Sequence, residues 1–173
     1  PGLGQSDWGL QLAAEACASG RPMVLDADAL NLLAAGRIAA PAHCVLTPHP
    51  GEAARLLGVD VAAIAQDRYA AVRELARRFR AIVVLKGAGS LIADHGGAVA
   101  VCPFGNPGMA AGGMGDALTG VIAALIAQGL GLVDAARAGV TVHALAGDRA
   151  AGNGERGLLA TDLIAELRML VNP

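Results

Sequence analysis

Short, uninterrupted apolar runs alternate with longer amphipathic stretches in the first half of the chain. Three such runs, at residues 22–26, 43–47 and 81–86, are rich in Val, Leu and Ile and predict buried strands. Because their apolar residues are continuous rather than alternating, we expect a mostly parallel sheet covered by helices on both faces. Residues 91–93 and 98–101 flank a His-Gly-Gly turn and predict a β-hairpin. The pattern is that of an α/β fold.

Apolar residues at helical spacing predict the other elements. A helix is expected to begin at Glu52, and others to cover residues 7–19, 61–79, 116–128, 132–151 and 161–171. Thr161 is the expected N-cap of the last helix. The uncharged stretch 117–133 is shorter than the roughly 20 apolar residues that a bilayer span needs. It therefore predicts a buried helix rather than a membrane helix.

The composition favours a close-packed domain with no polyanionic partner. The chain has 173 residues, including 39 Ala and 24 Gly, and only 2% of its residues are aromatic. This length suits a single domain over residues 1–173. A net charge of −2 gives no field that would attract nucleic acid or anionic lipid, so neither partner is expected. Three cysteines without CxxC spacing indicate a reducing, cytoplasmic location rather than a disulfide or zinc framework.

The first four residues have the character of a turn inside a fold. Pro1-Gly2-Leu3-Gly4 contains no initiator Met and follows no strand or helix. We therefore expect that the N-terminal part of the fold is missing from this chain.

The segment 106–120 carries the strongest chemical signal. It is a glycine-rich loop that leads directly into an apolar helix, and its glycines at 112, 113 and 115 allow successive backbone N–H groups to face one space. Together with the helix dipole they would form a nest for a phosphate. Asp116 at the helix start is either a simple N-terminal helix acid or a general base that deprotonates a hydroxyl during phosphoryl transfer.

Two further loops follow predicted strands. In Thr47–Glu52 two prolines stiffen the turn, and its His49 and Glu52 either serve only the connection or contact a substrate and orient a water or a divalent ion. Lys86–Ser90 is either a hairpin turn or a loop that meets a nucleotide phosphate. Ligands of parallel sheets bind beyond the carboxyl ends of the strands, where these loops and Asp26 fall.

The other histidines are expected to have no role in chemistry. His43 precedes a strand and His95 lies in a hairpin turn, so both should be solvated. His143 lies within an Ala/Val-rich helix and should be an interior histidine with a satisfied hydrogen bond. The spacing of His and Cys residues does not indicate a metal site.

Taken together, these segments resemble the ADP-dependent NAD(P)H-hydrate dehydratase family of the ribokinase-like superfamily. The likeness covers essentially the whole chain, and the matching segments occur in the family's order. They are Pro1–Gly4, Leu25–Asn31, Leu46–Glu52, Leu85–Gly87 and Asn106–Gly120. One departure is Ala111, where the family usually has Thr. This change removes a hydroxyl near the nest but leaves the glycines and Asp116 in place.

The resemblance implies a three-layer α/β/α fold and a repair reaction. NADHX or NADPHX would be dehydrated to NADH or NADPH, with ADP consumed, AMP and phosphate released, and Mg²⁺ as counter-ion. No magnesium ligand is assigned, and a homo-oligomer, a tetramer in the family, is expected. The implied residues are Asp116, Gly113 and Gly115 for catalysis; Gly4, His49, Glu52 and Asp116 for the hydrate; and Lys86, Gly87, Ala88, Gly89, Ser90, Gly112 and Gly115 for the nucleotide.

Two alternatives share parts of this pattern. A small-molecule kinase of the same superfamily, acting on a vitamin-precursor alcohol, would use the same nest and acid. A non-catalytic nucleotide-binding or assembly protein would keep the fold without the reaction. A kinase leaves a stable phosphorylated product and the dehydratase leaves free phosphate, so a product assay separates them.

Overall fold

Five strands form one open sheet in the computed structural model, which describes residues 1–172. The strands lie in the sheet in their order along the chain, β1-β2-β3-β4-β5. The first three are parallel, β4 is antiparallel to β3, and β5 is antiparallel to β4. The predicted mostly parallel sheet and the predicted hairpin are both confirmed. The strands are β1 (Met23–Leu25), β2 (Cys44–Leu46), β3 (Ile82–Leu85), β4 (Ser90–Ala93) and β5 (Val99–Cys102).

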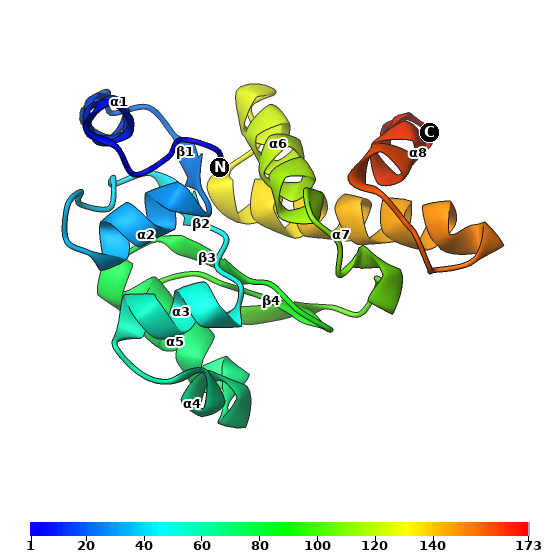
Figure 1. Cartoon of the computed structure of the whole chain (residues 1–173), viewed down its shortest axis with the longest axis horizontal. Coiled ribbons are helices and arrows are strands. Elements are labelled where there is room, and N and C mark those ends of the chain that lie inside the picture. The colour runs from blue at the N-terminus through cyan, green and yellow to red at the C-terminus, as the bar shows by residue number, and fades with distance from the viewer. Residues whose placement is uncertain (173) are drawn as a thin grey trace.

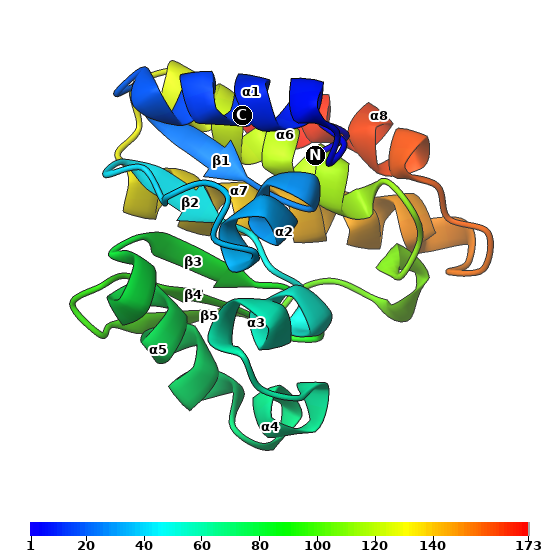
Figure 2. The same ribbon diagram turned by 60° about the vertical axis from the view of Figure 1, so that its left-hand side comes forward.

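Helices cover both faces of the sheet, as Figures 1 and 2 show. One face packs against the first five α-helices, and the other face packs against α6 and α7, with α8 lying against α7. The chain therefore has the predicted three-layer arrangement. The helices are α1 (Asp7–Ala18), α2 (Asp28–Ala34), α3 (Pro50–Leu57), α4 (Val61–Gln66), α5 (Arg68–Phe79), α6 (Met114–Ala127), α7 (Leu132–Ala150) and α8 (Ala160–Val171), with short 3₁₀ turns at Pro107–Met109 and Ala151–Asn153.

Burial on both faces explains the continuous apolar runs. In β3, Val83 and Leu85 join the core beneath α5, whereas Ile82 and Val84 join the core beneath α7. All four side chains are almost fully buried. An alternating pattern would have placed polar residues against one of the two helical layers.

The predicted helix over 61–79 is wrong, because two helices occupy this segment. Asp67 interrupts the helical backbone with φ −145° and ψ 86°. Its carboxylate accepts a hydrogen bond from the Ala70 N–H and so caps α5. The apolar spacing continues through the break, so periodicity alone could not locate it.

Two further elements differ from the prediction. The expected cap at Thr161 is wrong: α8 begins one residue earlier, at Ala160, with Leu159 at the N-cap position. The Asp162 carboxylate accepts a hydrogen bond from the Leu159 N–H there. The sequence analysis placed no helix between the first two strands, whereas α2 follows β1 directly and buries three leucines.

The predicted buried helix is α6, but only one side of it is buried. Met114, Leu118, Thr119 and Ile122 face the core, while the opposite side is exposed to solvent. That side consists of Ala and Gly, and Asp116 in the first turn is the only charged residue of the helix. Within residues 1–172, no helix combines the length and the apolar character needed to cross a bilayer.

Candidate active site

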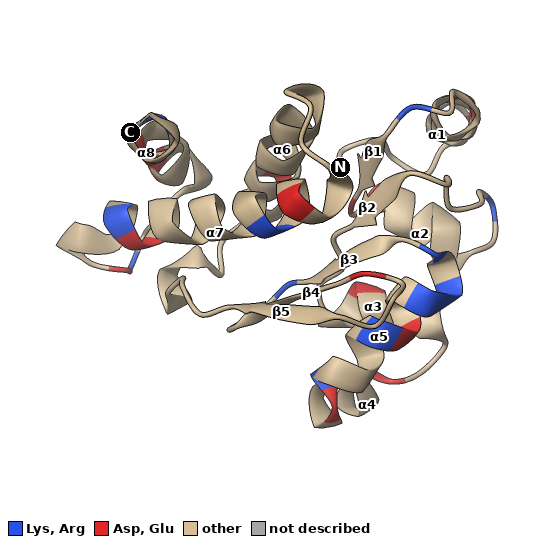
Figure 3. Ribbon diagram, turned by 180° about the vertical axis from the view of Figure 1, so that it is seen from behind, with Lys and Arg blue, Asp and Glu red and all other residues tan. Residues whose placement is uncertain are grey.

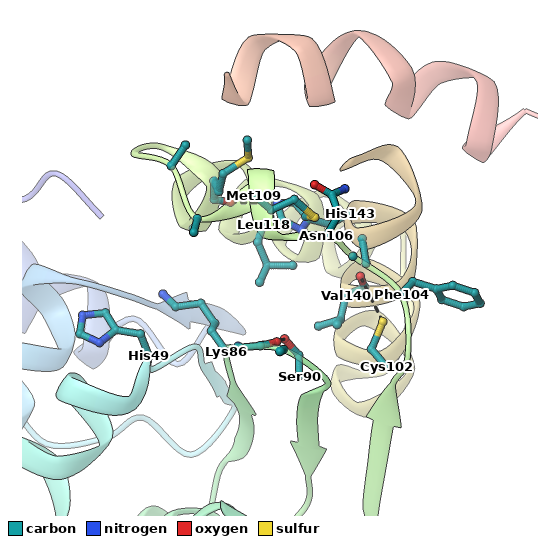
Figure 4. Close-up of a pocket in the computed structure, with 18 of the residues that line it drawn as sticks. His49, Lys86, Ser90, Cys102, Phe104, Asn106, Met109, Leu118, Val140 and His143 are labelled. Carbon is teal, nitrogen blue, oxygen red and sulfur yellow. Dashed lines mark hydrogen bonds between the residues drawn. The ribbon is translucent and has the colours of Figure 1, made fainter. Parts of the chain in front are cut away.

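A cavity of about 810 Å³ opens between the carboxyl ends of the strands and the N-terminus of α6 (Figure 4). It lies at the sheet edge that the sequence analysis selected. Most of the expected site residues line it, namely His49, Glu52, Lys86, Gly87, Ala88, Ser90, Gly115 and Asp116. Four expected residues do not belong to its lining: Gly4, Gly89, Gly112 and Gly113.

A buried ionic cluster occupies the polar end of the cavity. Lys86, directly after β3, places Nζ 2.7 Å from Asp26 Oδ1 and 3.7 Å from Glu52 Oε2. The side chains of Asp26 and Glu52 are 2% and 6% exposed, and that of Lys86 is 18% exposed. Thr119 of α6 donates a hydrogen bond to Asp26 Oδ2 at 3.2 Å. Residues from two strand ends, α3 and α6 therefore meet around one ammonium group.

The turn before α3 is built by His49 and Glu52 themselves. His49 Nδ1 accepts hydrogen bonds from the N–H groups of Gly51 and Glu52, and Glu52 Oε2 accepts one from the His49 N–H. This reciprocal arrangement is a capping box, and Pro50 occupies the first helical position. The structural role considered for Glu52 is thus present, but the same carboxylate also faces Lys86. His49 is half exposed at the cavity wall, with Nε2 3.5 Å from Glu52 Oε1.

The N-terminus of α6 forms the opposite side of the polar end. Gly113 is the N-cap, with φ 83°, and no side chain of the described residues caps this helix. The backbone N–H groups of the first turn are therefore available to an anion. Asp116 lies in this turn, is exposed, and lines the cavity. This arrangement suits phosphoryl binding beside a base.

The loop 86–90 is held by contacts that the sequence did not reveal. Arg68, at the start of α5, donates hydrogen bonds to the carbonyl oxygens of Ala88 and Gly89 at 2.6 and 3.0 Å. The Ser90 hydroxyl donates to the Gly87 carbonyl and accepts from the Gly87 N–H. The loop therefore has a fixed backbone along the cavity wall.

The other end of the cavity is apolar. Its wall combines Cys102, Phe104, Leu118, Val140 and Ala144, from β5, α6, α7 and the segment after β5. In Figure 4 the side chain of Leu118 extends into the space between these elements and Lys86. Such a surface accommodates flat or apolar parts of a ligand.

Asp148 of α7 holds the segment that leads to the glycine-rich loop. Its carboxylate accepts hydrogen bonds from the Gly105 N–H and from the Asn106 side-chain amide, both at 2.9 Å. The Asn106 side-chain oxygen in turn accepts from the Gly108 N–H at 3.0 Å. Asp148 lies in the last turn of α7, 43 and 42 residues after Gly105 and Asn106, where no sequence pattern marks it.

His143 is the interior histidine that the sequence analysis expected. It is 7% exposed, and its Nε2 lies 2.9 Å from the Met114 carbonyl oxygen, which requires the proton on Nε2. Burial lowers the pKa of His143; the hydrogen bond to Met114 opposes this change and the nearby Lys86 charge adds to it. The net effect favours the neutral ring. His43 and His95 are exposed, as expected.

The partners of Lys86 were not predicted from the sequence. Asp26 was predicted only as an acid at a strand end, and no role was predicted for Thr119. The position of Asp26 beside the sheet edge was the available signal. Thr119 carried none, because a threonine inside an apolar helix usually bonds to its own backbone.

The cavity offers few ligands for a metal ion. Among residues 1–172 no three His, Cys, Asp or Glu side chains are grouped so that they could hold one. A magnesium ion that arrives with a nucleotide needs only one or two protein carboxylates, because phosphates and water supply the rest. Glu52 and Asp116, which both line the cavity, fit that requirement.

The mostly parallel sheet between helical layers, with a cavity at the carboxyl ends of its strands, defines an α/β protein of the ribokinase-like kind. A family model for NAD(P)H-hydrate dehydratase matches residues 1–169. The chain therefore belongs to the NAD(P)H-hydrate dehydratase family.

Similar proteins of known type are repair enzymes. The chain is 53% identical over 174 residues to a bifunctional NAD(P)H-hydrate repair enzyme of Coxiella burnetii, a match that covers 100% of this chain and 36% of that protein. It is 45% identical over 159 residues to an ADP-dependent (S)-NAD(P)H-hydrate dehydratase of Neisseria meningitidis, covering 88% and 54%. The chain thus spans about a third to a half of the length of these relatives.

Solved structures give the same family and fold. The ADP/ATP-dependent NAD(P)H-hydrate dehydratase of Bacillus subtilis, crystallised with ATP and Mg²⁺, matches with a TM-score of 0.86 and 30% identity over 98% of this chain and 61% of that one. A hydroxyethylthiazole kinase of Pyrococcus horikoshii matches with a TM-score of 0.77 at 18% identity, over 95% and 68% of the two chains. The second likeness shows the shared ribokinase-like fold.

Proposed function

We propose that this chain catalyses the ADP-dependent dehydration of NADHX and NADPHX to NADH and NADPH. The observation that carries the proposal is the position of Asp116, a carboxylate in an uncapped first helical turn that lines the same cavity as Lys86 and His49. A base, a phosphoryl site and a cation beside one another are what phosphorylation of an alcohol requires. The names of the relatives supply the substrate class.

The first chemical step is phosphoryl transfer to the C6 hydroxyl of the hydrated ring. Asp116 takes the hydroxyl proton, the hydroxyl oxygen forms a bond to the β-phosphorus of ADP, and the bond from that phosphorus to AMP breaks. The backbone of Gly112–Gly115 and the ammonium of Lys86 meet the charge of the transferred group. Of these groups, Asp116, Gly115 and Lys86 line the cavity.

The second step is elimination. The ring nitrogen donates its electron pair, the C6–O bond breaks, and phosphate leaves with the bonding electrons. Loss of the adjacent C5 proton then restores the double bond of the reduced nicotinamide. Phosphate is a far better leaving group than hydroxide, which explains why a nucleotide is consumed in a dehydration.

The other assignments come from the family resemblance. His49, Glu52 and Gly4 are proposed to contact the hydrate, and Lys86–Ser90 with Gly112 and Gly115 to contact ADP. Gly4, Gly89 and Gly112 are the members of this set that do not line the cavity. When bound, magnesium neutralises phosphate charge, with Glu52 or Asp116 as the available protein ligand. Arg68 gives the 86–90 loop a fixed backbone against which a nucleotide can bind.

Product analysis tests this proposal. The chain is incubated with NADPHX, ADP and magnesium, and reduced nicotinamide, AMP and inorganic phosphate are measured together. We expect one AMP and one phosphate for each NADPH recovered, and no recovery without ADP. A stable phosphorylated product would instead identify a small-molecule kinase, and no nucleotide turnover by the folded chain would identify a non-catalytic nucleotide-binding protein.

We also propose that the chain works as a cytoplasmic homo-oligomer. Support comes from the exposed Ala and Gly side of α6, which would allow close helix packing, and from exposed Ile164, Met169 and Val171 on α8. Light scattering on the purified chain tests the assembly, and a monomer at micromolar concentration would contradict it.

A further inference from the structure

Asp26 is a buried carboxylate to which the reaction steps above give no role. It directly follows β1, is 2% exposed, and accepts hydrogen bonds from Lys86 Nζ and from the Thr119 hydroxyl. A carboxylate this buried is stable only when paired. Its partners come from 60 and 93 residues further along the chain. Asp26 therefore joins the end of β1 to the nucleotide loop and to α6.

Lys86 is the only lysine in the sequence. The other twelve of the thirteen Lys and Arg residues are arginines. Its ammonium lies against the backbone of α6, because a Cβ at Gly115 would lie 3.2 Å from Nζ and 3.4 Å from Asp26 Oδ2. The absence of a side chain at Gly115 therefore leaves space for the ammonium.

The location of this ammonium is unfavourable without the carboxylates. The first turn of a helix carries partial positive charge and repels a cation. Lys86 nevertheless lies beside the first turn of α6, with Asp26 and Glu52 on its other sides. Ala27, next to Asp26, has φ 46°, a conformation that costs an L residue energy and is common at functional sites. A phosphoryl group at this turn would meet the helix and the ammonium together.

We propose that Asp26 is a positioning residue, whose buried carboxylate holds the Lys86 ammonium against the first turn of α6 where the phosphoryl group is transferred. In this arrangement Gly115 is glycine partly to leave room for Nζ, and Thr119 keeps the Asp26 carboxylate in the orientation that faces Lys86. The role in catalysis rests on the proposed function, whereas the hold on Lys86 does not.

The single lysine allows a direct test of the hold. Isotope-labelled lysine gives one side-chain ammonium signal in an NMR spectrum of the full chain. We expect a protected signal in the wild type and in the control Asp134→Asn, which changes an exposed carboxylate in the first turn of α7. Asp26→Asn should speed exchange of the ammonium protons at least about tenfold or abolish the signal, because the charged acceptor is lost. An unchanged signal in Asp26→Asn would overturn the proposal.

Kinetics test the role in catalysis. Asp26→Asn should lower kcat about 10- to 100-fold, while KM for NADPHX changes less than about threefold, since misplacement of a catalytic group acts on the transition state. If Asp26 acts through Lys86, the double variant Asp26→Asn/Lys86→Met should be no slower than Lys86→Met alone. Losses that multiply would show an independent role and contradict the proposal.

A second variant covers the case in which Asp26→Asn does not fold. Gly115→Ala keeps every charged group and improves helix propensity, but its methyl group must displace Nζ. Like Asp26→Asn, Gly115→Ala should change the NMR signal of the Lys86 ammonium and lower kcat. An unshifted signal would count against the proposal. If the folded wild type shows no ADP-dependent recovery at all, the proposed function fails. The ammonium measurement then still decides whether Asp26 holds Lys86.

Discussion

Two ion pairs in this chain have the same separation and opposite surroundings. Lys86 Nζ and Asp26 Oδ1 lie 2.7 Å apart, and so do Arg77 Nη2 and Glu74 Oε1. The first pair lies buried between the sheet and α6. The second lies exposed on α5, along whose ribbon several basic and acidic positions are coloured in Figure 3. Distance alone therefore says little about what a pair contributes.

The difference lies in what replaces each pair when it is broken. Water and dissolved ions stabilise the charges of Arg77 and Glu74 about as well as the pairing does. The pair therefore contributes little to the stability of the fold. Water does not solvate the buried Asp26 carboxylate in place of Lys86. Removal of one partner therefore leaves an unpaired buried charge. The buried pair is also the one that faces the proposed reaction.

Removal of the ammonium should have the largest effect on stability. Lys86→Met leaves the Asp26 and Glu52 carboxylates close together without a cation, which should lower the free energy of unfolding by about 3 kcal/mol. Urea denaturation at neutral pH measures this loss. A loss below about 1 kcal/mol would mean that water reaches the pair freely through the cavity.

Removal of the hydroxyl beside Asp26 should have a smaller effect. Thr119→Val is nearly isosteric and deletes one hydrogen bond to a charged acceptor, so a loss of about 1.5 kcal/mol is expected. Thr141→Val is the matched control, because its partly exposed hydroxyl bonds only to the helix backbone at Arg137. Equal losses in the two variants would contradict a special role for Thr119.

Protonation of His143 should make the stability of the same region depend on pH. Burial lowers the pKa of His143 below the 6.5 of the unfolded chain, and the Lys86 charge lowers it further despite the hydrogen bond to Met114. The unfolded chain then binds the proton more readily, so the contribution to stability is complete above pH 6.5 and is lost as pH falls through that value. Unfolding measured near pH 7.5 and near pH 5.5 should show a larger acid loss in the wild type than in His143→Gln. An equal loss of stability in the wild type and in His143→Gln would mean that another group titrates.

The exposed pair should give the smallest effect. The hydrogen bond from Arg77 lowers the pKa of Glu74, but the side chains of Arg77 and Glu74 are 72% and 44% exposed to solvent. Glu74→Gln should therefore leave the melting temperature unchanged within error at both low and high salt. A clear decrease would show that the surface pair contributes as the buried pair does.

The sequence predicted the architecture because its signals are local or periodic. Continuous apolar runs predicted the parallel strands. The loops after two of these strands indicated His49 and Lys86, and the glycine-rich segment 106–120 indicated Asp116. The break at Asp67 and the roles of Thr119 and Asp148 were beyond reach, because each depends on a side chain's partner rather than on spacing. Gly4 illustrates the converse case: the family motif assigns it to the hydrate, while here its N–H donates to Asp28 at 2.8 Å outside the cavity lining.

The most direct test of the central claim compares the wild type with Asp116→Asn in ADP-dependent recovery of NADPH from NADPHX, at saturating ADP and magnesium. Asp116 is exposed, so the substitution should leave the fold and the melting temperature unchanged. We predict a decrease in kcat of about 1,000-fold, the range of a lost general base. A variant that recovers NADPH at the wild-type rate would contradict the assignment of this helix terminus as the catalytic site.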